Sequence, residues 1–172
     1  QFGIDPAGFT CVDVGASSGG FTDVLLTRGA AKVFAVDVGH GQLDWKLRSD
    51  DRVVVMERTN ARHLTADDIP DPIDMVVCDA SFISLKTVLP AAMSLVKPAG
   101  WLVALIKPQF EVGRENVGKK GVVRDPALHE AVCADMSDWL VDVMGWELLG
   151  VAKSPITGPE GNVEFLLGGR KP

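Results

Sequence analysis

Residues 12–22 read Val-Asp-Val-Gly-Ala-Ser-Ser-Gly-Gly-Phe-Thr and join an apolar run to an amphipathic segment. The apolar run, Phe9 to Val14, predicts a strand, and the amphipathic segment predicts a helix directly after the turn. Because Gly15, Gly19 and Gly20 have no Cβ, the backbone N–H groups of this turn can approach a ligand closely. The segment therefore predicts a strand–turn–helix unit that binds a small molecule at its turn.

Several ligand classes use such a turn, and the residues around the glycines help to separate them. A P-loop has lysine where this chain has Phe21, and a dinucleotide fingerprint has glycine where it has Ser17. Gly15-Ala-Ser-Ser-Gly19 also matches the nucleophile elbow of hydrolases, with Ser17 as nucleophile, although that elbow normally follows several strands. An acid before the turn, Asp13, repels phosphate but attracts the sulfonium and ammonium groups of S-adenosylmethionine (SAM). The turn favours SAM and leaves nucleotide binding, a serine hydrolase and a plain tight turn as alternatives. The candidate cofactor contacts in this segment are Asp13, Gly15, Ala16, Ser17, Gly19 and Gly20.

Composition limits the class of protein. The 172 residues are 47% hydrophobic, which is enough for one domain with a substantial core. No apolar run reaches the roughly 18–20 residues of a membrane span, and no signal peptide pattern is present. The three cysteines are far apart and predict buried free thiols in a reducing cytoplasm, while the three scattered histidines predict no metal site. A net charge of −6 argues mildly against a domain that grips nucleic acid unaided.

Strand and helix patterns alternate along the chain without internal repeats. Strands are expected at 9–14, 32–38, 52–57, 73–79, 101–107, 146–153 and 162–168, and helices at 21–28, 43–48, 87–96 and 126–144. The alternation predicts a parallel, doubly wound sheet, and the short Gly/Pro-rich link before the last strand predicts an antiparallel hairpin. We therefore expect one α/β domain over residues 1–172, with the Rossmann-like fold of class I SAM-dependent methyltransferases and a mostly parallel seven-stranded sheet.

Polar residues follow four of these strands at the sheet edge where ligands bind in such folds. Asp37 follows the second strand, where it could accept both ribose hydroxyls of an adenosine, and Asn60 follows the third, where it could pair with adenine. Asp79 ends the fourth strand and Lys107 the fifth. One such residue is usually a helix cap or a solvated side chain. Together with the glycine turn they predict a cofactor pocket, to which Asp79 also contributes.

The residues after the fourth strand help to predict which chemical group accepts the methyl group. Enzymes that methylate exocyclic amines favour Asp/Asn-Pro-Pro-Tyr/Phe here, whereas this chain has Asp79-Ala-Ser-Phe82. A hydroxyl acceptor fits better, because its proton must be removed or its oxygen steered. A desolvated Lys107 could act as the base, and Asp79 could hold it. Glu164, alone among apolar neighbours, could join them or could simply face outward on an edge strand.

Five segments together resemble the haemolysin-A-type, FtsJ-like ribosomal RNA 2′-O-methyltransferases. They are Asp13-Val-Gly-Ala-Ser-Ser-Gly-Gly-Phe-Thr-Asp, Cys78-Asp-Ala-Ser-Phe-Ile-Ser-Leu, Ile106-Lys-Pro-Gln-Phe-Glu, Gly121-Val-Val-Arg-Asp and Ser154-Pro-Ile-Thr-Gly-Pro-Glu-Gly-Asn-Val-Glu. The resemblance covers essentially the whole chain. It implies SAM as methyl donor, S-adenosylhomocysteine as product, and a ribose 2′-hydroxyl of ribosomal RNA in the ribosomal subunits as acceptor. It also implies a Lys-Asp-Lys-Glu tetrad whose last three members are Asp79, Lys107 and Glu164, with Lys107 as the central catalytic lysine.

The chain departs from this family pattern upstream of the glycine turn. The resemblance implies an earlier tetrad lysine and an N-terminal S4-type RNA-binding domain, whereas the first lysine here is Lys32. Both differences predict a fragment that binds SAM but methylates RNA weakly or not at all. We also expect the chain to be a monomer. A non-catalytic module that binds SAM or RNA is therefore a further alternative.

Charge patterns bear on the partners of the chain. A basic stretch near the reaction centre predicts RNA contacts at Arg114, Lys119, Lys120 and Arg124. The best amphipathic segment, 126–144, carries several acids and no lysine or arginine, which is the wrong charge for anionic lipid. A membrane-lytic role is therefore disfavoured.

Overall fold

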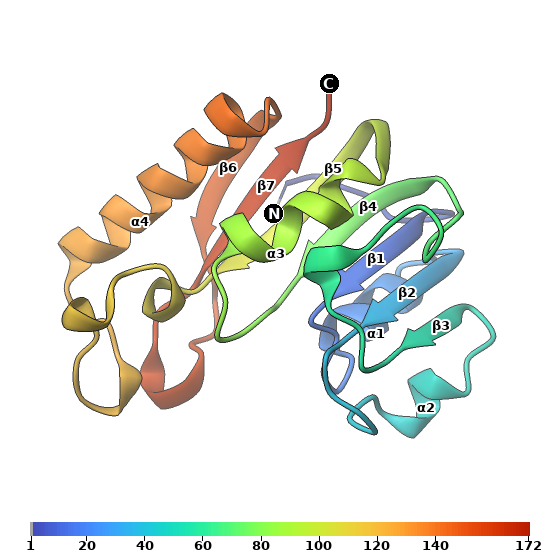
Figure 1. Ribbon diagram of the computed structural model, residues 1–172, viewed down its shortest axis with the longest axis horizontal. Helices are drawn as coiled ribbons and strands as arrows, with labels where there is room; N and C mark the ends of the chain where they lie inside the picture. Colours follow the sequence, from blue (N-terminus) through green and yellow to red (C-terminus); the bar gives the residue numbers. More distant parts are fainter. Residues whose placement is uncertain (1) are drawn as a thin grey trace.

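The computed structural model describes residues 2–172 and contains a seven-stranded sheet with helices on both faces (Figure 1). The strands are β1 Thr10–Val14, β2 Lys32–Val36, β3 Val53–Met56, β4 Ile73–Cys78, β5 Val96–Ile106, β6 Glu147–Lys153 and β7 Phe165–Arg170. Their order is β3-β2-β1-β4-β5-β7-β6, with β1 to β5 parallel and β7 antiparallel to both of its neighbours. The predicted doubly wound sheet with a terminal hairpin is confirmed.

Each main helix begins at a residue suited to capping. The helices are α1 Gly20–Thr27, α2 Trp45–Arg48, α3 Leu85–Ser94 and α4 Pro126–Asp138, which continues as a π-helical turn over Trp139–Val143. The side chains of Asp44, Ser84 and Asp125 accept backbone N–H bonds at the starts of α2, α3 and α4. Gly19 precedes α1 with φ +105°, a conformation that few other residues adopt. No helix within residues 2–172 is long and apolar enough to cross a membrane.

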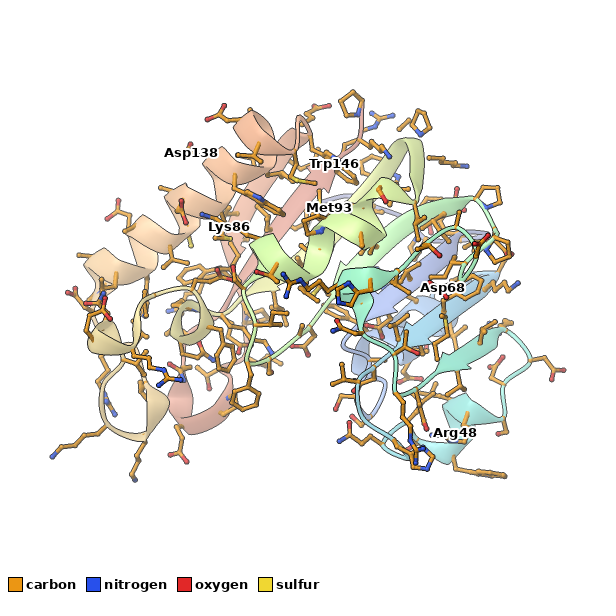
Figure 2. All side chains as sticks on the ribbon, in the orientation of Figure 1. Arg48, Asp68, Lys86, Met93, Asp138 and Trp146 are labelled. Carbon is orange, nitrogen blue, oxygen red and sulfur yellow. The ribbon has the colours of Figure 1, made fainter. Side chains whose placement is uncertain are left out.

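Two cores form because successive strand residues point to opposite faces of the sheet. Cys11 and Val33 pack with α1 and α2 on one face, whereas Val12 and Val76 pack with α3 and α4 on the other. Figure 2 shows Met93 and Trp146 on the second face, where both are buried. Asp138 is exposed, and Lys86 of α3 pairs with Asp135 of α4 at 2.7 Å. Burial raises the pKa of the Cys11 and Cys78 thiols to about 12, so both remain protonated. Within the described residues all three cysteines are free, and Cys11 and Cys78 are buried as predicted, whereas Cys133 is half-buried.

Three predicted boundaries were wrong, each for a local reason. β5 begins at Val96, not residue 101, because Val96 pairs with Ile73 across an irregular register. The side chain of Lys171 supports this start by donating to the Val96 carbonyl at 2.6 Å. The predicted strand 162–168 is instead β7 Phe165–Arg170, an interior strand between β5 and β6. The predicted helix 87–96 begins earlier, at Leu85, where Ser84 caps it.

Candidate active site

A cleft of about 450 Å³ opens at the carboxyl ends of β1, β2, β3 and β4. Its walls come from the turns that follow these strands, as strand-end reasoning predicted. The lining residues are Val14, Gly15, Ser17, residues 36–39, Gln42, residues 59–61, residues 79–83 and Val88. This volume is typical of small-molecule sites, which span roughly 300–1,000 Å³.

Gly15 joins the turn after β1 to the turn after β4. Its φ is +76°, and an added Cβ would lie only 2.9 Å from the Ala80 Cα and from the carbonyl oxygen of Asp79. The Val36 carbonyl accepts the N–H groups of Gly15 and Ala16 at 2.9 and 3.0 Å. Only glycine fits this position, and its packing brings Asp79 to the same opening as the glycine turn.

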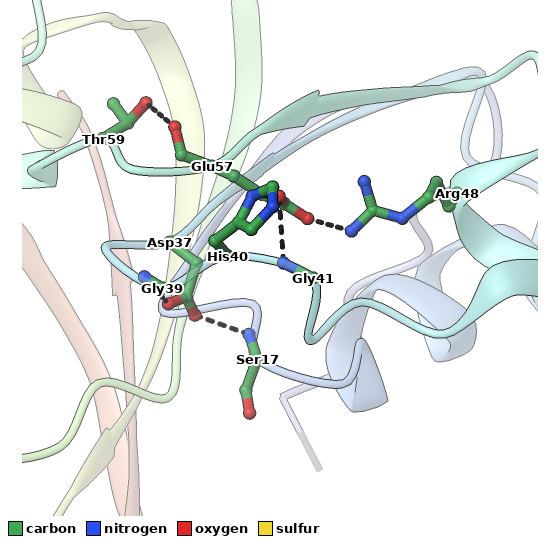
Figure 3. Close-up of polar contacts among 8 residues, drawn as sticks. All are labelled: Ser17, Asp37, Gly39, His40, Gly41, Arg48, Glu57 and Thr59. Atoms are coloured by element: carbon green, nitrogen blue, oxygen red, sulfur yellow. Dashed lines mark hydrogen bonds and ion pairs between the residues drawn. The ribbon is translucent and has the colours of Figure 1, made fainter.

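Asp37 organises the opposite wall of the cleft (Figure 3). Its Oδ2 accepts the N–H of Ser17 at 2.7 Å, and its Oδ1 accepts the N–H of Gly39 at 2.8 Å. Each carboxylate oxygen can accept a second bond, so both remain available to ligand hydroxyls. Asn60 also lines the cleft, and its Oδ1 accepts the N–H of Arg62 at 3.0 Å, which leaves its amide N–H groups as donors.

Four predicted cofactor contacts do not line the cleft. Asp13 is only 1% exposed and lies beneath the turn, where its Oδ2 accepts the Thr22 hydroxyl at 2.7 Å. The Asp13 Oδ1 has no hydrogen-bond partner, and burial raises the pKa of this carboxyl to about 7. The other three positions are Ala16, Gly19 and Gly20, which belong to the turn and the start of α1.

Ser17 has an unusual backbone for the residue suggested as a hydrolase nucleophile. Its φ of +52° places it in the left-handed region, and its N–H bonds to Asp37. Within residues 2–172 its hydroxyl has no hydrogen bond to a histidine, which a serine nucleophile needs as its base. The geometry at Ser17 fits a ligand-binding turn better than a nucleophile.

Lys107 directly follows β5 and is 7% exposed. Its Nζ lies 2.5 Å from Asp79 Oδ1 and donates to the Ser81 hydroxyl at 3.0 Å. Asp79 and Ser81 line the cleft, so Lys107 Nζ lies directly behind this part of the cleft wall. The structure thus brings together Asp79 and Lys107, and adds Ser81, which sequence reasoning missed although it lies in the Asp-Ala-Ser-Phe motif.

Glu164 precedes β7 and is 6% exposed, so it does not face outward on an edge strand. Its carboxylate packs directly on the Cα of Gly158, where any side chain would collide with it. Its Oε2 is buried without a hydrogen-bond partner, as is Oε1 of Gln109. Burial raises the pKa of Glu164, while the nearby Lys107 charge and the Gln109 amide oppose that rise. Gln109 is therefore a second residue that sequence reasoning missed, although it lies in the Ile-Lys-Pro-Gln-Phe-Glu motif.

The predicted RNA-binding residues lie between β5 and α4. Their side chains are exposed, and they are Arg114, Lys119, Lys120 and Arg124. Asn162, which is 3% exposed, holds this segment by donating to the Gly121 carbonyl at 2.9 Å and accepting the Val123 N–H at 3.0 Å. His129 of α4 contacts the Val123 carbonyl at 2.7 Å. The basic segment is therefore held against the segment that contains Asn162 and Glu164.

An exposed aromatic side chain stands beside the reaction centre. Phe82 is 89% exposed, has φ +64° and lines the cleft, with its ring centroid 5.0 Å from that of Phe110. Within residues 2–172 no group of three or more His, Cys, Asp or Glu side chains could hold a metal ion.

Comparison with known proteins identifies relatives of the whole chain. Residues 1–171 match the model of a family described as FtsJ-like methyltransferase. The chain is 54% identical over 166 residues to the 16S/23S rRNA (cytidine-2′-O)-methyltransferase TlyA of Mycobacterium tuberculosis, covering 96% of this chain and 62% of that protein. It is 42% identical over 167 residues to Hemolysin A of Brachyspira hyodysenteriae, covering 96% of this chain and 69% of that protein. The chain thus spans less than two thirds of the TlyA relative's length.

Solved structures show the same fold. The crystal structure of a proposed hemolysin from Lactococcus lactis matches with a TM-score of 0.95 and 45% identity, over 99% of this chain and 82% of that one. An S-adenosylmethionine-dependent methyltransferase from Mesorhizobium loti matches with a TM-score of 0.64 at 13% identity, over 98% of this chain and 93% of that one. The second match, at low identity, bears on the fold alone. Together with the strand order, it confirms the predicted methyltransferase fold.

Proposed function

Because the chain belongs to the FtsJ-like methyltransferase family, we propose that it transfers the methyl group of SAM to a ribose 2′-hydroxyl of ribosomal RNA. One observation carries the proposal. Lys107 Nζ is held by Asp79 and Ser81, two lining residues of a cleft whose volume suits a nucleoside cofactor. A buried lysine amine beside the cofactor site is suited to a hydroxyl acceptor, which must lose a proton during transfer.

The cofactor pocket follows from the groups that line the cleft. Asp37 accepts the ribose hydroxyls and Asn60 binds the adenine edge, while the backbone around Gly15 and Ser17 borders the methionine part. SAM supplies an electrophilic methyl group on its sulfonium sulfur. Asp13 supports the glycine turn from beneath, because its carboxylate accepts the hydroxyl of Thr22 in α1.

Three side chains act on the methyl acceptor, the ribose 2′-hydroxyl. Lys107 orients the 2′-oxygen and, as the neutral amine, takes the proton of the 2′-hydroxyl. The ammonium that this transfer produces is then paired with the Asp79 carboxylate. Glu164 lies close enough to influence the charge of Lys107, since that charge lowers the pKa of Glu164. When the oxygen–methyl bond forms, the carbon–sulfur bond breaks and the sulfur keeps the electron pair, which yields S-adenosylhomocysteine.

The RNA partner is proposed from the basic segment and the relatives. Arg114, Lys119, Lys120 and Arg124 are exposed and contact phosphates of ribosomal RNA in a ribosomal subunit. We further propose that the protein acts in the cytoplasm as a monomer. We also propose that residues 1–172 bind the cofactor but transfer methyl groups weakly, because none of these residues matches the first lysine of the tetrad that the resemblance implies.

The first test is calorimetric titration of this chain with S-adenosylhomocysteine, with NAD as the control ligand. Saturable binding of the first ligand alone supports the cofactor site, and binding of NAD alone overturns it. The second test compares this chain with an upstream-extended chain on ribosomal subunits with labelled SAM. Label on ribose 2′-oxygens only with the extended chain supports both the acceptor and the missing lysine, whereas equal activity refutes the need for upstream residues.

A further inference from the structure

The loop between β2 and α2 forms one wall of the cofactor cleft without regular secondary structure. Val38, Gly39 and Gln42 of this loop line the cleft. A cleft wall of this kind binds a ligand well only when its backbone is held in one position, because ordering it on binding costs conformational entropy. The residue that contacts it from the next strand is Glu57, which follows β3. Glu57 does not line the main cleft, but it lines a small adjoining hollow together with Asp37 and Gly39.

Donors from three residues converge on the Glu57 carboxylate (Figure 3). Its Oε2 accepts the N–H of Gly41 at 3.0 Å and contacts Nδ1 of His40 at 2.8 Å, while its Oε1 binds the guanidinium of Arg48 in α2. The side chain of Glu57 is only 14% exposed. The Gly41 N–H bond, followed by Arg48, lowers the pKa of Glu57, so the carboxylate is ionised at neutral pH.

The backbone after Glu57 ties the same loop a second time. The Gly39 carbonyl accepts the N–H of Arg58 at 3.0 Å, and the Asp37 carbonyl accepts the N–H of Thr59 at 2.9 Å. The Thr59 hydroxyl donates to the Glu57 carbonyl at 2.9 Å. Asp37 in turn bonds to Ser17, so the contacts run from Glu57 through the loop to the glycine turn.

We infer that Glu57 is a positioning residue for the cofactor, which fixes the backbone of residues 37–42 and thereby aims Asp37 at the ligand. This inference rests on the proposed function, because it assumes that the cleft binds SAM. Glutamine cannot replace Glu57, since its single carbonyl oxygen cannot serve both the Gly41 N–H and Arg48, and its NH₂ group would face one of these donors. The ionised carboxylate is therefore required at this position to hold the loop.

The experiment compares Glu57→Gln with Asp50→Asn by calorimetric titration with S-adenosylhomocysteine. Asp50 is a matched control, because it pairs with Arg52 at 2.8 Å before β3 and does not line the cleft. We expect Glu57→Gln to weaken binding about tenfold, which corresponds to about 1.4 kcal/mol, and Asp50→Asn to leave it unchanged. Amide hydrogen exchange should rise at Gly39 and Gly41 in Glu57→Gln and stay unchanged at core strands such as β4.

The outcomes separate this inference from the proposed function. Tight binding by Glu57→Gln, equal to that of the unaltered chain, overturns the role of Glu57 and leaves the cofactor site intact. If the unaltered chain does not bind S-adenosylhomocysteine, both the proposed cofactor site and the role of Glu57 are overturned. A variant that exchanges faster throughout has lost global stability, and His40→Gln then decides the question. The His40 side chain is 65% exposed, so its replacement should not disturb the core. About threefold weaker binding of S-adenosylhomocysteine by His40→Gln, with unchanged amide exchange in the core strands, supports the positioning role of Glu57. Unchanged binding by His40→Gln in that case refutes it.

Discussion

The two halves of the cleft differ in how their polar groups are satisfied. In the cofactor half, both oxygens of Asp37 and both oxygens of Glu57 already have partners within the chain. In the acceptor half, Glu164 Oε2 and Gln109 Oε1 are buried without any. A buried acceptor without a donor costs about 1–3 kcal/mol. The acceptor half has two such oxygens, whereas the cofactor half has one, Asp13 Oδ1, which lies beneath the turn and not in the cleft wall. The cofactor half is organised before binding, and the acceptor half is suited to receiving donors.

The largest expected effect separates the two halves at Lys107. Lys107→Ala in an upstream-extended chain should lower the rate of methyl transfer about 10³-fold, because it removes the group that orients the acceptor and takes its proton. Binding of S-adenosylhomocysteine should not change. Lys86→Ala is the control, since Lys86 pairs with Asp135 on the surface. If cofactor binding and methyl transfer fell together, the division into two halves would be wrong.

Asp13 is the exception within the cofactor half, and it gives the second prediction. Its pKa rises from 3.8 to about 7 on folding, so the native state binds a proton more tightly than the unfolded chain does. Stability from this group is complete below pH 4 and is lost as the pH rises to about 7. Relative to Asp13→Asn, the unaltered chain should lose up to about 4 kcal/mol across this range.

Urea unfolding at several pH values measures this loss. Asp23→Asn, on the exposed side of α1, is the control and should keep the pH dependence of the unaltered chain. The Asp13→Asn variant should show a flatter profile, and a profile parallel to that of the unaltered chain would contradict the prediction. That result would also mean that the carboxyl is ionised beneath the glycine turn at neutral pH.

The sequence could place those candidate site residues that lie at strand ends. Asp37, Asn60, Asp79 and Lys107 each follow a strand, and parallel strands deliver such residues to one edge. Asp13 was predicted as a cofactor contact, but strand alternation turns its side chain under the turn toward Thr22. The approximate sheet could be predicted for the same reason, since its strands have clear apolar patterns.

Other residues could not be predicted because their roles depend on distant backbone groups. Glu57 acts on the N–H of Gly41, and Asn162 acts on the backbone of Gly121 and Val123. No local pattern shows which backbone N–H or carbonyl will face such a side chain. The family resemblance supplied Glu164, but only the structure shows that its carboxylate packs against Gly158.

The third prediction tests the cofactor half directly. Asp37→Asn should weaken binding of S-adenosylhomocysteine about 30-fold, because the new NH₂ group would face the N–H of Ser17 or of Gly39. This loss should exceed that of Glu57→Gln, since Asp37 lines the cleft and Glu57 does not. Calorimetry on both variants gives the comparison. A larger loss for Glu57→Gln would show that the loop position matters more than the direct ligand contact.

The smallest expected effect sharpens the acceptor half. Asn162→Ala removes the hydrogen bonds that hold the basic segment, and each is worth about 1 kcal/mol. The segment should then present Lys119 and Lys120 less well, and the KM for ribosomal subunits should rise about fivefold in an upstream-extended chain. Binding of S-adenosylhomocysteine should stay constant, because Asn162 does not line the cofactor cleft.

The control and the charge dependence decide how Asn162 acts. Asn116→Ala alters an exposed residue of the same segment and should leave the KM unchanged. Replacing both Lys119 and Lys120 by glutamine should weaken RNA binding and flatten its salt dependence. If Asn162 works by presenting these lysines, the double replacement should have less effect in Asn162→Ala than in the unaltered chain. Strictly additive effects would mean that Asn162 supports only the neighbouring segment that carries Glu164. The basic segment would then bind RNA independently of Asn162.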